Sequence, residues 1–79
     1  MEIKVLGQGC ANCKRTKAIA AEVVKELNVD ATIVEVTDLP TIMEYGILST
    51  PGIVINEKVM RSGGVPTKQQ MIQLIQQAH

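Results

Sequence analysis

The segment Gly7-Gln8-Gly9-Cys10-Ala11-Asn12-Cys13-Lys14 contains both cysteines of the chain, in the spacing C-x-x-C. It lies between a short apolar run, residues 3–6, and a long stretch with the periodicity of a helix. Two thiols at positions i and i+3 can reach each other at the start of a helix. Unpaired N–H groups and the helix dipole at that end favour a thiolate, which lowers the pKa of the first cysteine. The segment is therefore typical of a thiol–disulfide redox site or of a site for a soft metal ion.

The composition fits one small globular domain spanning residues 1–79 and narrows the classes of function. The formal net charge is zero and Tyr45 is the only aromatic residue, so we expect no nucleic-acid partner. No apolar run approaches the roughly 20 residues that span a bilayer, and the first residues do not resemble a signal peptide. We therefore expect a cytoplasmic monomer with no membrane partner. In a reducing cytosol, a lone cysteine pair is more often catalytic or metal-binding than a structural disulfide.

Hydrophobic periodicity predicts an α/β fold with the element order β-α-β-α-β-β-α. Helix signals support this order. Asp38 is an expected N-cap, Gly46 an expected stop, and Thr67 with Gln70 fits a capping box. Strands are expected at residues 2–6, 31–36, 53–55 and 58–61, and helices at about 10–27, 38–45 and from 67 to the end of the chain.

The arrangement of the strands follows from their connections. The first two strands should be parallel because a helix connects them, and this crossover should be right-handed. The last two should form an antiparallel hairpin around the turn Asn56-Glu57, which gives a mixed four-stranded sheet flanked by helices. The first and third strands are the most apolar and should be central. We expect the first and last helices to cover the two faces of the sheet between them.

The two cysteines are expected to differ in chemical role. Cys10 comes first and nearest the unpaired N–H groups, which makes it the better nucleophile. Cys13 lies one turn further into the helix, where it should be more buried and suited to resolving a mixed disulfide. Lys14 and Arg15 follow directly and add positive charge near the site.

A second feature, Thr50-Pro51, stands just before the apolar strand 53–55. A C-x-x-C at the start of the first helix, followed by Thr-Pro before the C-terminal hairpin, resembles thioredoxins and glutaredoxins. The closest likeness is to the very small thioredoxin-like proteins of archaea and bacteria called redox-active disulfide proteins. These share the G-x-G-C-x-x-C opening, the T-P-x corner and a Gly-Gly near the last helix, which is Gly63-Gly64 here. The likeness covers essentially the whole chain.

This resemblance implies a minimal thioredoxin fold and a thiol–disulfide oxidoreductase. Cys10 would attack a substrate disulfide and Cys13 would resolve the mixed disulfide. The reversible Cys10–Cys13 disulfide would carry the electrons without a further cofactor and with no metal. The expected partners are disulfide-bearing proteins as substrates, and a reductase or a low-molecular-weight thiol as electron donor.

The resemblance also implies a substrate-binding surface opposite the cysteines. Pro51 would form a cis peptide bond and pack against the disulfide. The backbone of Thr50 would pair with an extended substrate segment, with Gly52 completing the corner. Gly63 and Gly64 lie where glutaredoxins hold part of glutathione, although a Gly-Gly before a helix is more often only a turn.

The chain departs from the family pattern between the cysteines. Ala11-Asn12 replaces the Gly-Pro of thioredoxins and the Pro-Tyr common in glutaredoxins. The chain has no tryptophan before the motif, and Glu35 does not match the buried aspartate of thioredoxins. The reduction potential and the electron donor therefore stay open.

A soft-metal carrier is the alternative function, because thiolate pairs also suit Cu(I) and zinc. Heavy-metal-associated domains resemble this chain at the cysteine motif, but their order is β-α-β-β-α-β and they end in a strand. They usually carry a methionine two residues before the first cysteine, where this chain has Gln8. A closed zinc site needs four ligands, and His79 is the only histidine available.

Overall fold

The computed structural model describes residues 1–8, 11–47 and 49–78, and the statements below concern those residues. The expected order β-α-β-α-β-β-α is confirmed. Each element lies within one or two residues of its predicted position. The elements are β1 (Glu2–Leu6), α1 (Ala11–Leu27), β2 (Thr32–Val36), α2 (Leu39–Glu44), β3 (Gly52–Ile55), β4 (Lys58–Ser62) and α3 (Lys68–Ala78).

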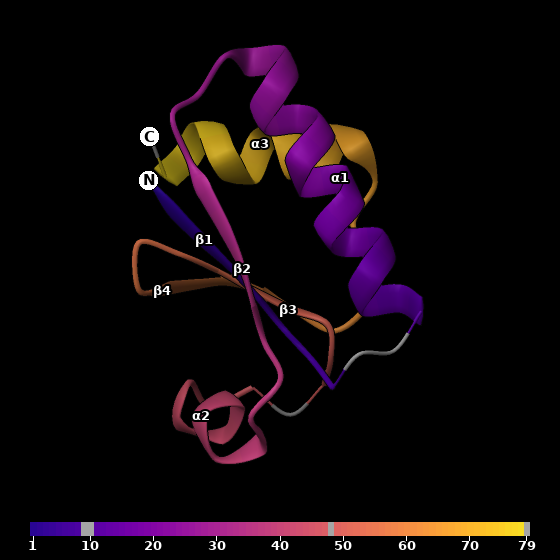
Figure 1. The fold of residues 1–79 in the computed structure, drawn as a ribbon, viewed down its shortest axis with the longest axis vertical. Helices are drawn as coiled ribbons and strands as arrows, with labels where there is room; N and C mark the ends of the chain where they lie inside the picture. Colours follow the sequence, from indigo (N-terminus) through magenta and orange to yellow (C-terminus); the bar gives the residue numbers. More distant parts are fainter. Residues whose placement is uncertain (9–10, 48, 79) are drawn as a thin grey trace.

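The strands form a mixed four-stranded sheet in the order β2-β1-β3-β4, so β1 and β3 are central as predicted (Figure 1). β1 and β2 are parallel, whereas β3 runs antiparallel to both of its neighbours. The β1–β3 register runs from Ile3 opposite Ile55 to Leu6 opposite Gly52. The C-terminal ends of β1 and β2, which lead to α1 and α2, therefore lie at the same end of the sheet as the start of β3.

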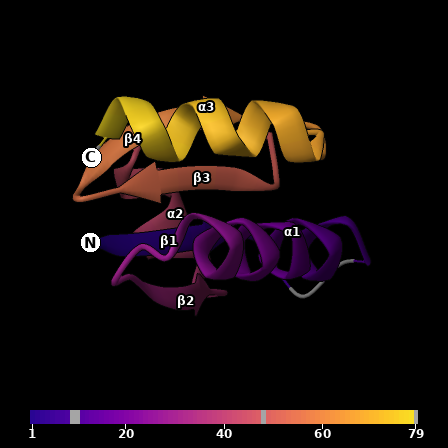
Figure 2. The same cartoon turned by 90° about the horizontal axis from the view of Figure 1, so that it is seen from above.

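The prediction that the first and last helices cover opposite faces of the sheet is wrong. α1 and α3 contact each other and share one face, and α2 lies on the opposite side of the strands (Figures 1 and 2). Alternate residues of β1 and β3 point to opposite faces, which gives two separate cores. The larger core consists of Ile3, Ala20, Val23, Ile53, Ile55, Met71 and Ile75, and the smaller one of Leu6, Ile42, Ile47 and Val54.

All three helix signals predicted from the sequence are confirmed. The Asp38 carboxylate caps α2 by accepting from Thr41 N at 3.3 Å and from Thr41 Oγ1 at 2.6 Å. Gly46 follows the last turn of α2 with φ +75°, a conformation that suits glycine. Thr67 Oγ1 accepts from Gln70 N at 3.1 Å, and Gln70 Oε1 accepts from Thr67 N at 2.9 Å, which completes the capping box of α3.

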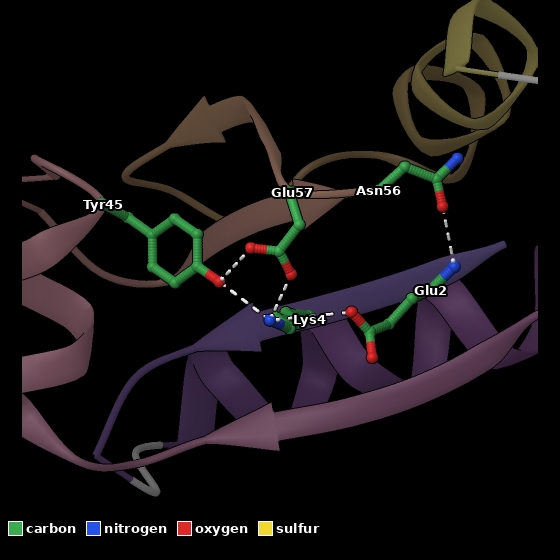
Figure 3. Close-up of polar contacts among 5 residues, drawn as sticks. All are labelled: Glu2, Lys4, Tyr45, Asn56 and Glu57. Atoms are coloured by element: carbon green, nitrogen blue, oxygen red, sulfur yellow. Dashed lines mark hydrogen bonds and ion pairs between the residues drawn. The ribbon is translucent and has the colours of Figure 1, made fainter.

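A polar network surrounds Lys4 of β1 (Figure 3). Lys4 Nζ donates to Tyr45 OH at 2.8 Å and to Glu57 Oε1, and Tyr45 OH donates to Glu57 Oε2 at 3.0 Å. The bond to Glu57, followed by that to Tyr45, raises the pKa of Lys4 above its ordinary value. The bond from Lys4, followed by that from Tyr45, lowers the pKa of Glu57. The network joins β1, the end of α2 and the β3–β4 turn.

Candidate active site

Cys13 lies in the first turn of α1 and packs against Gly7, the residue that follows β1. Its exposed fraction is 4%. A Cβ atom added to Gly7 would overlap Cys13 Sγ and lie 3.3 Å from Cys13 Cβ. Gly7 is held in position because its N–H donates to Val36 O at 2.9 Å, which extends the β1–β2 ladder. The absence of a side chain at Gly7 therefore makes the space that the buried sulfur occupies.

Thr50, which precedes β3, also lies close to Gly7. Its Cβ lies 3.7 Å from the position of a Cβ added to Gly7. The Thr50–Pro51 peptide bond is cis, as the family resemblance implied, and Pro51 is buried. Pro51 O accepts from Gly63 N at 2.9 Å, so the start of β3 and the end of β4 are joined there. The structure thus brings together Gly7, Cys13 and Thr50. Pro51 follows Thr50 in the chain and is hydrogen-bonded to Gly63.

The three remaining glycines of the predicted surface have different surroundings. A Cβ on Gly52 would overlap Ile47 Cδ1 on the α2 face, so Gly52 allows close packing there. A Cβ on Gly63 would lie 3.0 Å from Ser49 Cβ, so these two loops touch. Gly63 and Gly64 both have positive φ and form the turn after β4. Roles of these glycines in binding a substrate stay predictions.

Cys10, the predicted nucleophile, lies outside the described residues. In the sequence it directly precedes Ala11, where α1 begins. The described helix therefore starts one residue after Cys10 and contains Cys13 in its first turn.

The sequence interpretation missed Thr16, which is fully buried on the same face of α1 as Cys13. Its Oγ1 donates to Asn12 O at 2.8 Å, so a residue of the C-x-x-C motif accepts this bond. Ile19 and Val24, two larger apolar residues of the same helix, are only partly buried. The buried stripe of α1 consists of Cys13, Thr16, Ala20 and Val23. Because one of these residues is a polar threonine, hydrophobicity alone does not reveal the stripe.

In the part of the chain that the structure describes, no group of three or more His, Cys, Asp or Glu side chains is placed to hold a metal ion. None of the three helices combines the length and apolar character needed to cross a membrane.

Comparison with known proteins places this geometry in a family. The thioredoxin domain family matches residues 1–76. A thioredoxin of Methanothermobacter thermautotrophicus is 32% identical over 75 residues, which cover 95% of this chain and 97% of the relative. A thioredoxin of Methanocaldococcus jannaschii is 33% identical over 69 residues, covering 87% of this chain and 79% of the relative.

Two solved structures share the fold at low sequence identity. Thioredoxin 1 of Thermosipho africanus TCF52B superposes with a TM-score of 0.62 at 17% identity, over 98% of this chain and 92% of that one. A structure described as that of a malarial protein reaches a TM-score of 0.69 at 13% identity, over 98% and 94% of the two chains. With a minimal thioredoxin fold and archaeal thioredoxins as relatives over nearly its whole length, the chain belongs to the thioredoxin family and is a thiol–disulfide oxidoreductase.

Proposed function

We propose that this protein reduces disulfides of proteins or small molecules by exchange with the Cys10–Cys13 dithiol. The Cys10 thiolate attacks one substrate sulfur, which forms a mixed disulfide and releases the other substrate sulfur as a thiolate that takes up a proton. The Cys13 thiolate then attacks the Cys10 sulfur and releases the second substrate thiol. Two electrons pass to the substrate and the Cys10–Cys13 disulfide is left. A reductase or a low-molecular-weight thiol reduces this disulfide for the next cycle.

The burial of Cys13 is the observation that carries this division of roles. Cys13 is only 4% exposed and its sulfur packs against Gly7, so it is poorly placed to meet an incoming protein disulfide. It is suited to a second attack on a sulfur of its own chain, because exchange depends on access to the sulfur attacked. Cys10 precedes the first helical residue, where the helix N-terminus favours a thiolate.

In this proposal, Thr50 and Pro51 form the substrate-binding surface opposite the cysteines. Thr50 precedes the first ladder pair of β3, Leu6 opposite Gly52, so it stands at the end of the sheet that faces Gly7. An extended substrate segment could add to the backbone at this end and bring its disulfide toward the cysteines. Gly63 and Gly64 would border the same substrate-binding surface.

The remaining expectations belong to the same proposal. The enzyme would act as a cytoplasmic monomer on disulfide-bearing proteins. It would use no cofactor or metal beyond its own disulfide, and it would have no nucleic-acid or membrane partner. The single domain would span residues 1–79.

A turnover assay with a thiol donor tests the proposal. The wild type should reduce a protein disulfide catalytically, whereas Cys10→Ser should lose all activity. Cys13→Ser should retain the first attack but stop after it. If the wild type reduces no disulfide with dithiol donors or with thioredoxin reductase, or if Cys10→Ser turns over normally, the proposal is wrong.

The soft-metal alternative rests on the cysteine motif alone. The chain carries α2 between its second and third strands, where the heavy-metal-associated domains that it resembles at the motif have no helix. Membership of the thioredoxin family also favours the redox function. Stoichiometric retention of Cu(I) against a competing thiol, without disulfide reduction, would reverse this preference.

A further inference from the structure

Gly7 lies close to both the sulfur of Cys13 and the side chain of Thr50. A Cβ atom added to Gly7 would overlap Cys13 Sγ, lie 3.3 Å from Cys13 Cβ and lie 3.7 Å from Thr50 Cβ. The N–H of Gly7 donates to Val36 O at 2.9 Å, which fixes Gly7 at the end of the β1–β2 ladder. The backbone of Gly7 therefore bounds the space in which the Cys13 sulfur lies.

The Cys13 sulfur is directed at the segment of chain that leads to Cys10. Gly7 directly follows β1 and comes three residues before Cys10 in the sequence. Thr50, which precedes the cis Pro51, meets Gly7 at the same point. Cys13 is buried, so protein atoms limit the other directions open to its sulfur. The observed direction is thus suited to an attack on a Cys10 sulfur that carries the substrate.

The resolving step makes strict demands on geometry. The Cys13 thiolate must approach Cys10 Sγ opposite the substrate sulfur that it displaces, and the disulfide that forms accepts only a narrow range of distances and torsion angles. A helical side chain has few alternatives, because one of its three staggered χ1 rotamers is rare. A methyl group on Gly7 would exclude the observed sulfur position, so the sulfur would have to rotate aside. A displacement on the order of 1 Å can slow a positioned reaction about 100-fold.

We propose that Gly7 is a positioning residue for the resolving step, because its lack of a side chain lets Cys13 Sγ point at Cys10. The proposal rests on the proposed function, since it assigns Gly7 to the second of that reaction's two steps. In this step a bond forms between Cys13 Sγ and Cys10 Sγ, and the bond from Cys10 Sγ to the substrate sulfur breaks. The substrate sulfur leaves with the electron pair and takes up a proton.

The first attack, by Cys10, should not depend on Gly7. A methyl group on Gly7 would meet Thr50 Cβ at 3.7 Å, an ordinary contact distance, so the proposed substrate-binding surface would stay in place. Only the sulfur of Cys13 would be displaced. The two steps should therefore respond differently to Gly7→Ala, whereas a general loss of stability would not single out the second step.

Single-turnover kinetics with dithiobis(nitrobenzoate) separate the two steps. Attack by Cys10 releases one coloured thiolate, at a rate proportional to the concentration of the reagent. Attack by Cys13 releases the second thiolate, at a rate independent of that concentration because the step is intramolecular. All proteins are assayed in sucrose, which favours the folded state, and circular dichroism confirms that they are folded.

Gly7→Ala should keep the first phase within about twofold of wild type and slow the second phase by roughly 10- to 100-fold. Val23→Ala is the matched control, because Val23 is fully buried ten residues further along α1 and its truncation destabilises the core by leaving a cavity. Its second phase should equal that of wild type. The slowing in Gly7→Ala should persist at high pH, since ionising the thiol does not return the sulfur to its place.

Three kinetic results would overturn the proposal while the proposed function stands. They are an unchanged second phase in Gly7→Ala, an equal slowing in Val23→Ala, and a difference from wild type that disappears at high pH. A Gly7→Ala chain that stays unfolded in sucrose would also overturn it, because the sulfur then cannot move aside within the fold. If the wild type releases no second thiolate in an intramolecular step, the proposed function itself fails.

Discussion

Replacing Gly7 with alanine should destabilise the reduced protein, because the new methyl group would take the space of the Cys13 sulfur. The added Cβ would overlap Cys13 Sγ, and it would lie 3.3 Å from Cys13 Cβ and 3.7 Å from Thr50 Cβ. Cys13 is buried in the first turn of α1, so its sulfur can move away only by rotating against the packed atoms around it or by shifting the start of the helix. Overpacking of this kind costs about 1–3 kcal/mol. In a domain of this size, each 1 kcal/mol lowers Tm by about 4–8 °C.

A double-mutant cycle isolates the contact between Gly7 and Cys13. The φ angle of Gly7 lies outside the left-handed region, so alanine at this position meets no backbone penalty of that kind. In a Cys13→Ala background the sulfur is gone, and Gly7→Ala should be neutral or stabilising by about 0.4–1 kcal/mol. Thermal melts of the four reduced proteins, followed by circular dichroism, give the coupling. Equal destabilisation by Gly7→Ala in both backgrounds, or no loss in the wild-type background, would refute the reasoning.

Two further predictions concern the polar groups of the fold. The pKa of Glu57 is held below its ordinary value of 4.5, so its ionised form stabilises the fold above that pH, and this contribution is lost as the pH falls through the lowered pKa. The stability difference between wild type and Glu57→Gln in urea denaturation should therefore shrink from neutral to strongly acidic pH; a constant difference would disprove this. Asp38→Ala should lose about 1 kcal/mol of unfolding free energy with the α2 cap, whereas Asp38→Asn should keep most of it. Equal losses in the two variants would show that capping is not the cause.

Local signals in the sequence were sufficient for the order and bounds of the elements. The cap at Asp38, the stop at Gly46 and the apolar run Ile53-Val54-Ile55 each act within a few residues, so one sequence displays them. The same run also indicated that both faces of the sheet are covered. It could not tell which helix covers which face, because an amphipathic helix shows that it has a buried side but not where that side docks.

Features that depend on distant residues were not predictable. The sequence shows Gly7 only as a glycine before the cysteine motif, whereas the structure places it in close contact with Cys13 and Thr50. Lys4 bonds to residues 41 and 53 positions away, and no local pattern indicates such a network. The predicted chemistry needed only the spacing of the cysteines and the Thr-Pro corner.

The central claim is that Cys10 attacks and Cys13 resolves, and trapping the mixed disulfide tests it most directly. Cys13→Ser is incubated with a disulfide substrate, and the adduct is mapped by mass spectrometry of its peptides. The account predicts a substrate disulfide-bonded to Cys10 and released by added thiol, while Cys10→Ser traps none. An adduct on Cys13 in Cys10→Ser, or no adduct on Cys10 although the wild type turns over, would contradict it.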